Sequence, residues 1–190
     1  MRVVGGSFSE NWRDFTTALR RFPGPGSNFV YADVDGNIGY HAAGRLPKRR
    51  GYTGDVPVDG STGSERGLAY ADLIAGLTGA EVVVVVAFDP PLAIRRRGIL
   101  QTEHLQVSME KDARELAAEA AELLAGRGRP ARAVIVRGHA AEAILDTAES
   151  EHVDLIVMGR RGLGRLRGAI VGSVSERVAR HAEVPVLLAT

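Results

Sequence analysis

From residue 53 to the C-terminus, short apolar runs alternate with longer stretches whose apolar residues recur at helical spacing. Residues 82–88 are almost pure valine, and residues 155–158 are again apolar at every position. Such runs are typical of strands buried on both faces, as in parallel sheets. The predicted strands are 53–58, 82–88, 133–136, 155–158 and 184–188, and the predicted helices are 62–79, 104–125, 140–151 and one that starts at 173.

This alternation predicts an α/β fold, a doubly wound five-stranded parallel sheet with helices on both faces. In helix 62–79, Thr62 and Glu65 have the spacing of a capping box, and Gly79 is placed to end the helix. The inward side of helix 104–125 is predicted to carry Leu116, Ala120, Leu123 and Leu124.

The first predicted strand is the weakest part of this fold. Thr53, Gly54 and Asp55 precede Val56 and Val58, the two good strand formers of the segment. A glycine and an aspartate are unfavourable in a strand that should lie at the centre of a sheet. We therefore expect a locally destabilised core at this strand.

Residues 1–60 have a different character and predict a small helix-plus-hairpin appendage. Residues 11–22 carry Trp12, Phe15 and Leu19 at helical spacing, and the proline–glycine run 23–26 ends this pattern. Residues 29–40 read as two short strands around Asp35 and Gly36, a strong hairpin signal.

The stretch 153–180 carries the clearest candidate chemistry. A buried strand leads into a loop that holds five glycines and four arginines, and Ser173 with Glu176 has capping-box spacing for the next helix. A glycine-rich loop followed by a helix N-terminus is a common way to hold phosphate. The P-loop and dinucleotide patterns do not fit, because no lysine precedes Ser173 and the glycine spacing differs. The alternative is a glycine loop that holds no ligand.

The spacing Gly159-x2-Gly162-x9-Gly172-Ser173, with VMG before it, RGLG within it and GSVSERV after it, resembles the ATP-binding signature of the universal stress protein family. The resemblance runs from about residue 56 to residue 190. It implies ATP as ligand, with or without Mg²⁺, and a homodimer that pairs through the last strand. That strand is apolar and is expected at a sheet edge.

The resemblance also implies which residues touch the nucleotide. Asp59 and the backbone of Ala87 would face the adenosine. The residues that would cradle ribose and phosphates are Gly159, Gly162, Gly172, Ser173 and Val174. Two alternatives stay open from the residues alone: Asp59 as a turn residue that accepts backbone N–H bonds, and the loop arginines as a solvated basic surface. His139 either lies near the site or begins the helix that follows it.

A second resemblance covers roughly residues 7–60. The segment NFVYADVDGNIGYHAAGRLPKRRGYTGDVPV is similar to an internal piece of the penicillin acylase family. In that family the nucleophilic serine lies upstream of this piece and the oxyanion asparagine downstream, so Ser7 is expected to be an ordinary loop residue. We therefore expect two parts: 1–54, an acylase-like fragment without catalytic residues, and 55–190, a nucleotide-binding domain. The first part is expected to add little stability.

Composition narrows the remaining function classes. The 190-residue chain has a formal net charge of +1 and no cysteine, and shows neither a signal peptide nor an apolar run long enough to span a membrane. A cytoplasmic protein without nucleic-acid or membrane partners is expected. The histidines lack metal-ligand spacing, and no catalytic set is evident. The prediction is thus an ATP-binding stress-response protein with at most slow ATP hydrolysis. The alternatives are a nucleotide-free dimeric module and an amidohydrolase-related fragment.

Overall fold

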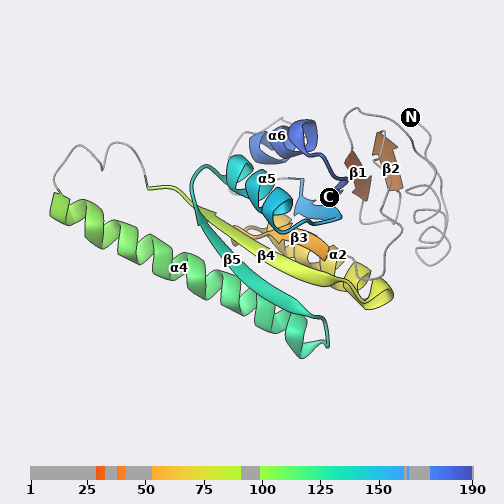
Figure 1. Ribbon diagram of the computed structural model, residues 1–190, viewed down its shortest axis with the longest axis horizontal. Coiled ribbons are helices and arrows are strands. Elements are labelled where there is room, and N and C mark those ends of the chain that lie inside the picture. The colour runs from red at the N-terminus through yellow and green to blue at the C-terminus, as the bar shows by residue number, and fades with distance from the viewer. Residues whose placement is uncertain are drawn as a thin grey trace.

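The computed structural model describes residues 29–32, 38–41, 53–90, 99–160, 162 and 172–189. A twisted sheet forms the middle layer, and two helices cover each of its faces (Figure 1). The strands are β1 (Phe29–Ala32), β2 (Ile38–His41), β3 (Thr53–Pro57), β4 (Glu81–Phe88), β5 (Ala131–Arg137), β6 (Leu155–Gly159) and β7 (Val186–Ala189). The helices are α2 (Thr62–Thr78), α4 (Ile99–Gly126), α5 (Ala140–Ser150) and α6 (Ser173–His181).

The sheet has the order β2-β1-β7-β6-β3-β4-β5, and every pair except β1–β2 is parallel. The five strands from β3 to β7 are the predicted parallel sheet, and the α/β fold is confirmed. From β3 the chain first builds outward through β4 to β5, then crosses to the other side of β3 to form β6 and β7. The direction of winding therefore changes between β3 and β6, at the topological switch point.

The valine run of β4 is explained by the two cores on which it packs. Val82, Val84 and Val86 belong to the core beneath α2 and α4, while Val83 and Val85 belong to the core beneath α5 and α6. Successive strand residues point to opposite faces, so a strand covered on both sides is apolar at every position. Each fully buried valine contributes about 1.5–3 kcal/mol relative to an exposed one.

The helices lie where the sequence predicts them, but some of their ends differ. Ser61, rather than the predicted Thr62, caps α2, since its Oγ accepts the Ser64 N–H at 3.1 Å. Gly79 ends α2 in the left-handed conformation with φ 69°, as predicted. The α4 helix starts at Ile99, earlier than predicted. Along its inward face Ala120 and Leu124 are buried and Leu116 packs against the core, but Leu123 is 47% exposed and was predicted wrongly.

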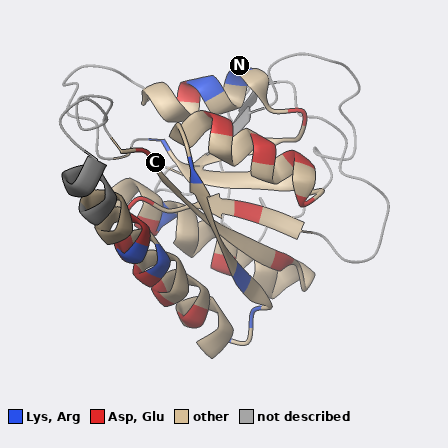
Figure 2. Cartoon of the chain, turned by 60° about the vertical axis from the view of Figure 1, so that its left-hand side comes forward, with Lys and Arg blue, Asp and Glu red and all other residues tan. Residues whose placement is uncertain are grey.

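The charged residues of α4 are mostly acidic, and Figure 2 shows its basic residues gathered near the middle of the helix. Two ion pairs on α4 join residues one helical turn apart, Arg114 with Glu110 at 2.6 Å and Lys111 with Glu115 at 3.5 Å, as the i, i+4 spacing allows. None of the described helices is both long and apolar enough to cross a membrane.

The predicted hairpin exists, but it lies in the sheet. β1 and β2 are antiparallel, with Ala32 opposite Ile38, and β1 pairs in parallel with β7 from Phe29↔Val186 to Ala32↔Ala189. The last strand, predicted at a sheet edge, is therefore an inner strand, and this prediction is wrong. The pairing has a physical reason, because an apolar strand with unpaired backbone groups recruits a further strand. The predicted helix at 11–22 lies outside the described residues.

β3 is the central strand that the sequence predicts, and it includes the unfavourable residues. Gly54 and Asp55 pair with Leu155 and Ile156 of β6. The Asp55 side chain is fully buried, and neither of its carboxyl oxygens has a hydrogen-bond partner among the described residues. Burial raises the pKa of Asp55 well above its ordinary value. The predicted part boundary between residues 54 and 55 lies within this strand.

Candidate site at the switch point of the sheet

The strands that flank the switch point separate toward their carboxyl ends. β3 pairs with β4 at five positions but with β6 only at Gly54↔Leu155 and Asp55↔Ile156. Beyond these pairs the two strands are no longer paired with each other, and Asp59 follows β3 while the glycine loop follows β6. In open α/β sheets, ligands bind in the crevice that such a divergence leaves.

The end of β6 packs directly on the first turns of α2. A Cβ atom added to Gly159 would lie well under 3.0 Å from the Gly63 backbone, a separation that real Cβ atoms essentially never show. A Cβ on Gly67 would lie 3.0 Å from the Gly159 nitrogen. Backbone therefore touches backbone at this point. Gly159, predicted to cradle a ligand, has a packing role that the sequence did not reveal.

Asp59 lies against the glycine loop. One carboxyl oxygen, Oδ1, accepts the Ser61 N–H at 3.0 Å, which is the turn role considered from the sequence. The other, Oδ2, faces Gly162, where an added Cβ would lie well under 3.0 Å from it. The structure thus brings Asp59 and Gly162 together, although they are far apart in sequence, and gives Asp59 both a turn bond and a place beside the loop.

The two ends of the glycine loop are hydrogen-bonded to each other. The Gly172 N–H donates to the Arg160 carbonyl oxygen at 2.9 Å, and the Ser175 hydroxyl donates to the same oxygen at 2.7 Å. The Arg160 N–H in turn donates to the Ala189 carbonyl at 2.8 Å. The loop therefore leaves and returns at one point beside β7. Residues 161 and 163–171 lie outside the described residues, and with them three of the four arginines considered as phosphate partners.

The α6 helix begins at this closure without a side-chain cap. Gly172 is its N-cap residue, so the predicted capping box of Ser173 and Glu176 is wrong. Glu176 pairs instead with Arg180 at 2.8 Å, one turn further along α6. Ser173 and Val174 are exposed at the first turn. N–H groups of a first helical turn that receive no side-chain cap, together with the helix dipole, favour an anion.

The carboxyl ends of β4 and β5 lie on the same side of the sheet as the carboxyl end of β3. The Val58 N–H donates to the Val85 carbonyl at 2.8 Å, which places Asp59 beside the end of β4, where Ala87 is half-buried. At the end of β5, His139 is the N-cap residue of α5, and its Nδ1 lies 2.9 Å from Asp89 Oδ2. His139 therefore begins a helix, as one of the two sequence interpretations holds. Among the described residues, no group of three His, Cys, Asp or Glu side chains is arranged to hold a metal ion.

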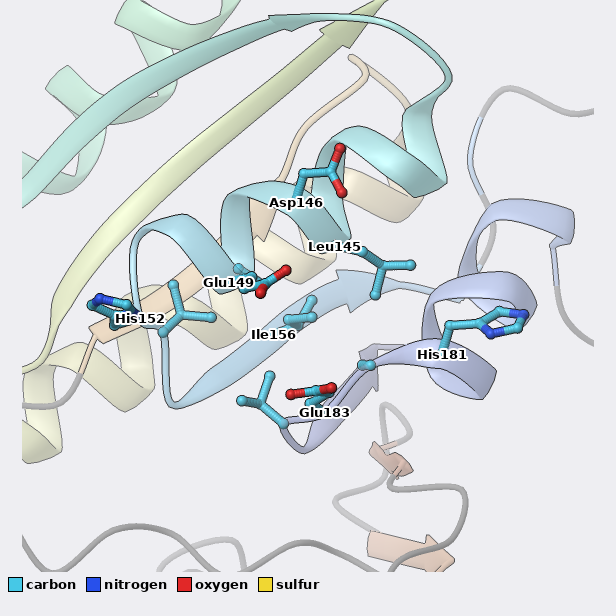
Figure 3. Close-up of a pocket in the computed structure, with 11 residues that line it drawn as sticks. Leu145, Asp146, Glu149, His152, Ile156, His181 and Glu183 are labelled. Atoms are coloured by element: carbon cyan, nitrogen blue, oxygen red, sulfur yellow. The ribbon is translucent and has the colours of Figure 1, made fainter.

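A cavity of about 370 Å³, which the sequence did not indicate, lies at the amino ends of the strands. It lies between the C-terminal ends of α5 and α6 and the starts of β6 and β7, with Leu145 and Ile156 among its apolar residues. Figure 3 shows His152 and His181 at its two ends. Because it lies at the amino ends of the strands, it is separate from the switch-point crevice.

The comparisons with known proteins agree with this geometry. The family model described as the universal stress protein family matches residues 56–190. The chain belongs to the universal stress protein family. A family member from Thermus aquaticus, the universal stress protein in the QAH/OAS sulfhydrylase 3′ region, is 39% identical over 131 residues, which cover 68% of this chain and 92% of that protein.

Solved structures of the family share the fold. The structure of hypothetical protein MJ0577, from Methanocaldococcus jannaschii, has a TM-score of 0.65 and 26% identity, covering 73% of this chain and 96% of that chain. A universal stress protein solved in complex with cAMP has a TM-score of 0.55 and 25% identity, covering 73% of this chain and 96% of its own.

A second family model, penicillin amidase, matches residues 4–107. The resemblance to that family was predicted to end near residue 60, so the match is longer than predicted and overlaps the first. In the overlap, residues 56–107, the described residues form the end of β3, α2, β4 and the start of α4. The hairpin β1–β2 lies within the penicillin amidase match and before the universal stress protein match.

Proposed function

We propose that this protein binds ATP in the switch-point crevice and acts in a stress response through the nucleotide-bound state rather than through catalysis. One observation carries the proposal. Three glycine contacts, Gly159 with Gly63, Gly162 with Asp59 and Gly172 with Arg160, bring the strand end, the loop and an uncapped helix start to one place. Bare backbone at a helix N-terminus suits phosphate, and an adjacent carboxylate suits a ribose hydroxyl.

In this proposal each predicted residue has a separate task. Asp59, held by its bond to the Ser61 N–H, presents its second oxygen to the adenosine together with the Ala87 backbone. The backbone around Gly162 and Gly172 and the first turn of α6, Ser173 and Val174, take the ribose and phosphates. The relative solved with cAMP supports an adenine nucleotide in this fold.

Mg²⁺ would enter this site bound to the phosphates of ATP. No described group of three acidic, histidine or cysteine residues is arranged for a metal ion, and Mg²⁺ commonly keeps phosphate oxygens and water among its ligands. A homodimer through β7 is not included in the proposed function, because β1 pairs with the edge of β7 that such a dimer needs. Location in the cytoplasm stays a prediction from composition.

Replacing Gly162 with alanine is expected to weaken ATP binding at least about tenfold, or about 1.4 kcal/mol. The added methyl group would collide with Asp59 Oδ2 and turn that carboxylate away from the ligand. Titration with a fluorescent ATP analogue measures the effect. Gly126→Ala is the matched control, since nothing lies within 4 Å of a Cβ at that position. Equal affinity of Gly162→Ala and wild type would contradict the proposal.

The nucleotide-free alternative is separated by a second measurement. Purified protein is denatured, and the supernatant is analysed by ion-exchange chromatography for released nucleotide. The proposal expects ATP or a breakdown product of it, either co-purified or retained after incubation with ATP. Absence of nucleotide under both conditions would favour a module of this fold that works without a ligand.

A further inference from the structure

Asp55 places a carboxyl group in the apolar core, on the strand that lies between β6 and β4. Its register partners, Val83 in β4 and Ile156 in β6, both belong to the core beneath α5 and α6. Register partners point to the same face of a sheet, so the Asp55 side chain lies in that core. It is fully buried, and neither of its oxygens has a hydrogen-bond partner among the described residues. Such a site favours the neutral carboxyl, because an ionised one loses water without gaining a partner.

The described residues around Asp55 supply no positive charge that is free to pair with it. The buried residues of α5 and α6 are alanine, isoleucine, valine, threonine and serine, none of which ionises. On the same face, Arg132 of β5 lies two strands away and is paired with Glu81 and Glu151. At the start of β6, Asp154 accepts a backbone N–H of β3. One arginine against three carboxylates leaves these surroundings acidic, which disfavours a further negative charge at Asp55.

Asp55 also lies in the contact that joins the two sides of the switch-point crevice. β3 pairs with β6 at only two positions, one of them Asp55↔Ile156, whereas it pairs with β4 at five. Four residues after Asp55, about 13 Å along an extended chain, Asp59 lies against Gly162. α2 follows β3 and packs on β6 from the other face, so the two strands can part only on the α5 face. The β3–β6 contact therefore sets how closely Asp59 approaches the glycine loop.

We propose that Asp55 links nucleotide binding to a proton: neutral Asp55 keeps β3 and β6 paired and the crevice formed, and ionised Asp55 parts the two strands and weakens binding. This link rests on the proposed function and adds to it a positioning residue that touches no ligand. An ionised Asp55 regains water only when the β3–β6 contact opens toward α5. Opening moves Asp59 away from Gly162, so the nucleotide binds the neutral form in preference.

The direction of the effect follows from linkage. Because ATP prefers the protonated form, the complex holds a proton that part of the free protein lacks. Burial raises the pKa of Asp55 above its ordinary value, so ATP affinity is full below the raised pKa and falls as pH rises through it. One proton limits the fall to about tenfold for each pH unit. Bound ATP should in turn raise the pKa of Asp55 further.

ATP affinity measured against pH tests the link in the full chain. Wild type, Asp55→Asn and Asp55→Leu are titrated with a fluorescent ATP analogue from about pH 5 to about pH 9, the range in which buried carboxyls titrate. Asparagine keeps the shape of the neutral carboxyl, so wild type should match Asp55→Asn at the acidic end and bind at least about tenfold more weakly at the alkaline end. Ionisation of ATP and of Asp59 changes all profiles alike, so the affinity ratio isolates Asp55.

Two further variants keep this test decisive. Asp154→Asn changes a partnered carboxyl at the same contact and should retain the wild-type profile. If Asp55→Asn does not fold, Asp55→Leu replaces it, since neither side chain ionises. Parallel profiles for wild type and the Asp55 variants would overturn the link and leave the ATP site in place. If no form binds ATP at any pH, the proposed function is wrong and the link falls with it.

Hydrogen exchange tests the opening without any nucleotide. Peptides that cover β3 and β6 should exchange at least about tenfold faster in wild type than in Asp55→Asn at about pH 9, and alike at about pH 5. Each comparison is made at one pH, so the base catalysis of exchange itself cancels. Peptides from β5, which does not touch Asp55, serve as the internal control. Equal exchange of the β3 and β6 peptides in both proteins at both pH values would overturn the proposal.

Discussion

Replacing Asp55 with leucine is expected to raise the free energy of unfolding by about 3 kcal/mol at pH 7. The carboxyl group lies in the core between Val83 and Ile156, its register partners in β4 and β6, and has no hydrogen-bond partner among the described residues. Leucine branches at the same carbon atom as aspartate, so methyl groups take the place of the two oxygens. Urea unfolding followed by circular dichroism measures the change.

The stabilisation should depend on pH, and its sign follows from the pKa. Burial raises the pKa of Asp55 in the folded state above the ordinary value of 3.8, which the unfolded chain keeps. Between the two values the folded state binds the extra proton, so this group lowers stability as pH rises from about 4 through the raised pKa. Below pH 4 the carboxyl is protonated in both states. The advantage of Asp55→Leu should therefore be smaller at pH 4.5 than at pH 8.

A second buried aspartate provides the control. Asp154 Oδ2 accepts the Thr53 N–H at 3.0 Å, and the Asp154 N–H donates to the Thr53 carbonyl at 2.8 Å. Asp154→Leu leaves the Thr53 donor without this partner and should lower stability by about 1–2 kcal/mol. Opposite signs for two aspartate-to-leucine changes, both at the contact of β3 with β6, would separate an unpartnered carboxyl from a partnered one. A loss of stability in Asp55→Leu would show that leucine does not fit the site.

The weakness of β3 could be predicted from the sequence because it depends only on residue type. Asp55 is unfavourable in a central strand wherever its neighbours lie. The position of the hairpin depends instead on which of several edges offers free backbone groups, and that is a property of the assembled sheet. A DG dipeptide predicts that two strands pair with each other. It carries no information that β1 also pairs with β7, more than one hundred and fifty residues later in the chain.

The candidate site, too, could be predicted from the sequence only in part. Glycine spacing predicted the loop, and the α/β pattern predicted its place at a strand end. The N-caps of α2 and α6 were each predicted one residue too late. Serine and threonine at neighbouring positions are equally good N-caps by composition, and Gly172 caps α6 with no side chain at all. The Gly159 contact was missed as a packing contact because its partner, Gly63, belongs to another element.

Replacing Gly159 with alanine is expected to lower the free energy of unfolding by about 3 kcal/mol and to abolish measurable ATP binding with it. The new methyl group would have to displace the backbone of Gly63 in the first turn of α2, and backbone yields less readily than the end of a side chain.

Gly67→Ala meets the Gly159 nitrogen at 3.0 Å, and alanine regains about 1 kcal/mol of helix propensity there, so its cost should be under half as large. Gly126→Ala, in open space, should be close to neutral. Thermal and urea unfolding of the three variants should rank them in this order. The same unfolding measurements should separate Gly159→Ala from Gly162→Ala, which is expected to lose ATP affinity while keeping stability. A Gly159→Ala variant as stable as wild type would mean that β6 and α2 do not approach as closely as the glycine contact requires, and the switch-point crevice would then need a different geometry.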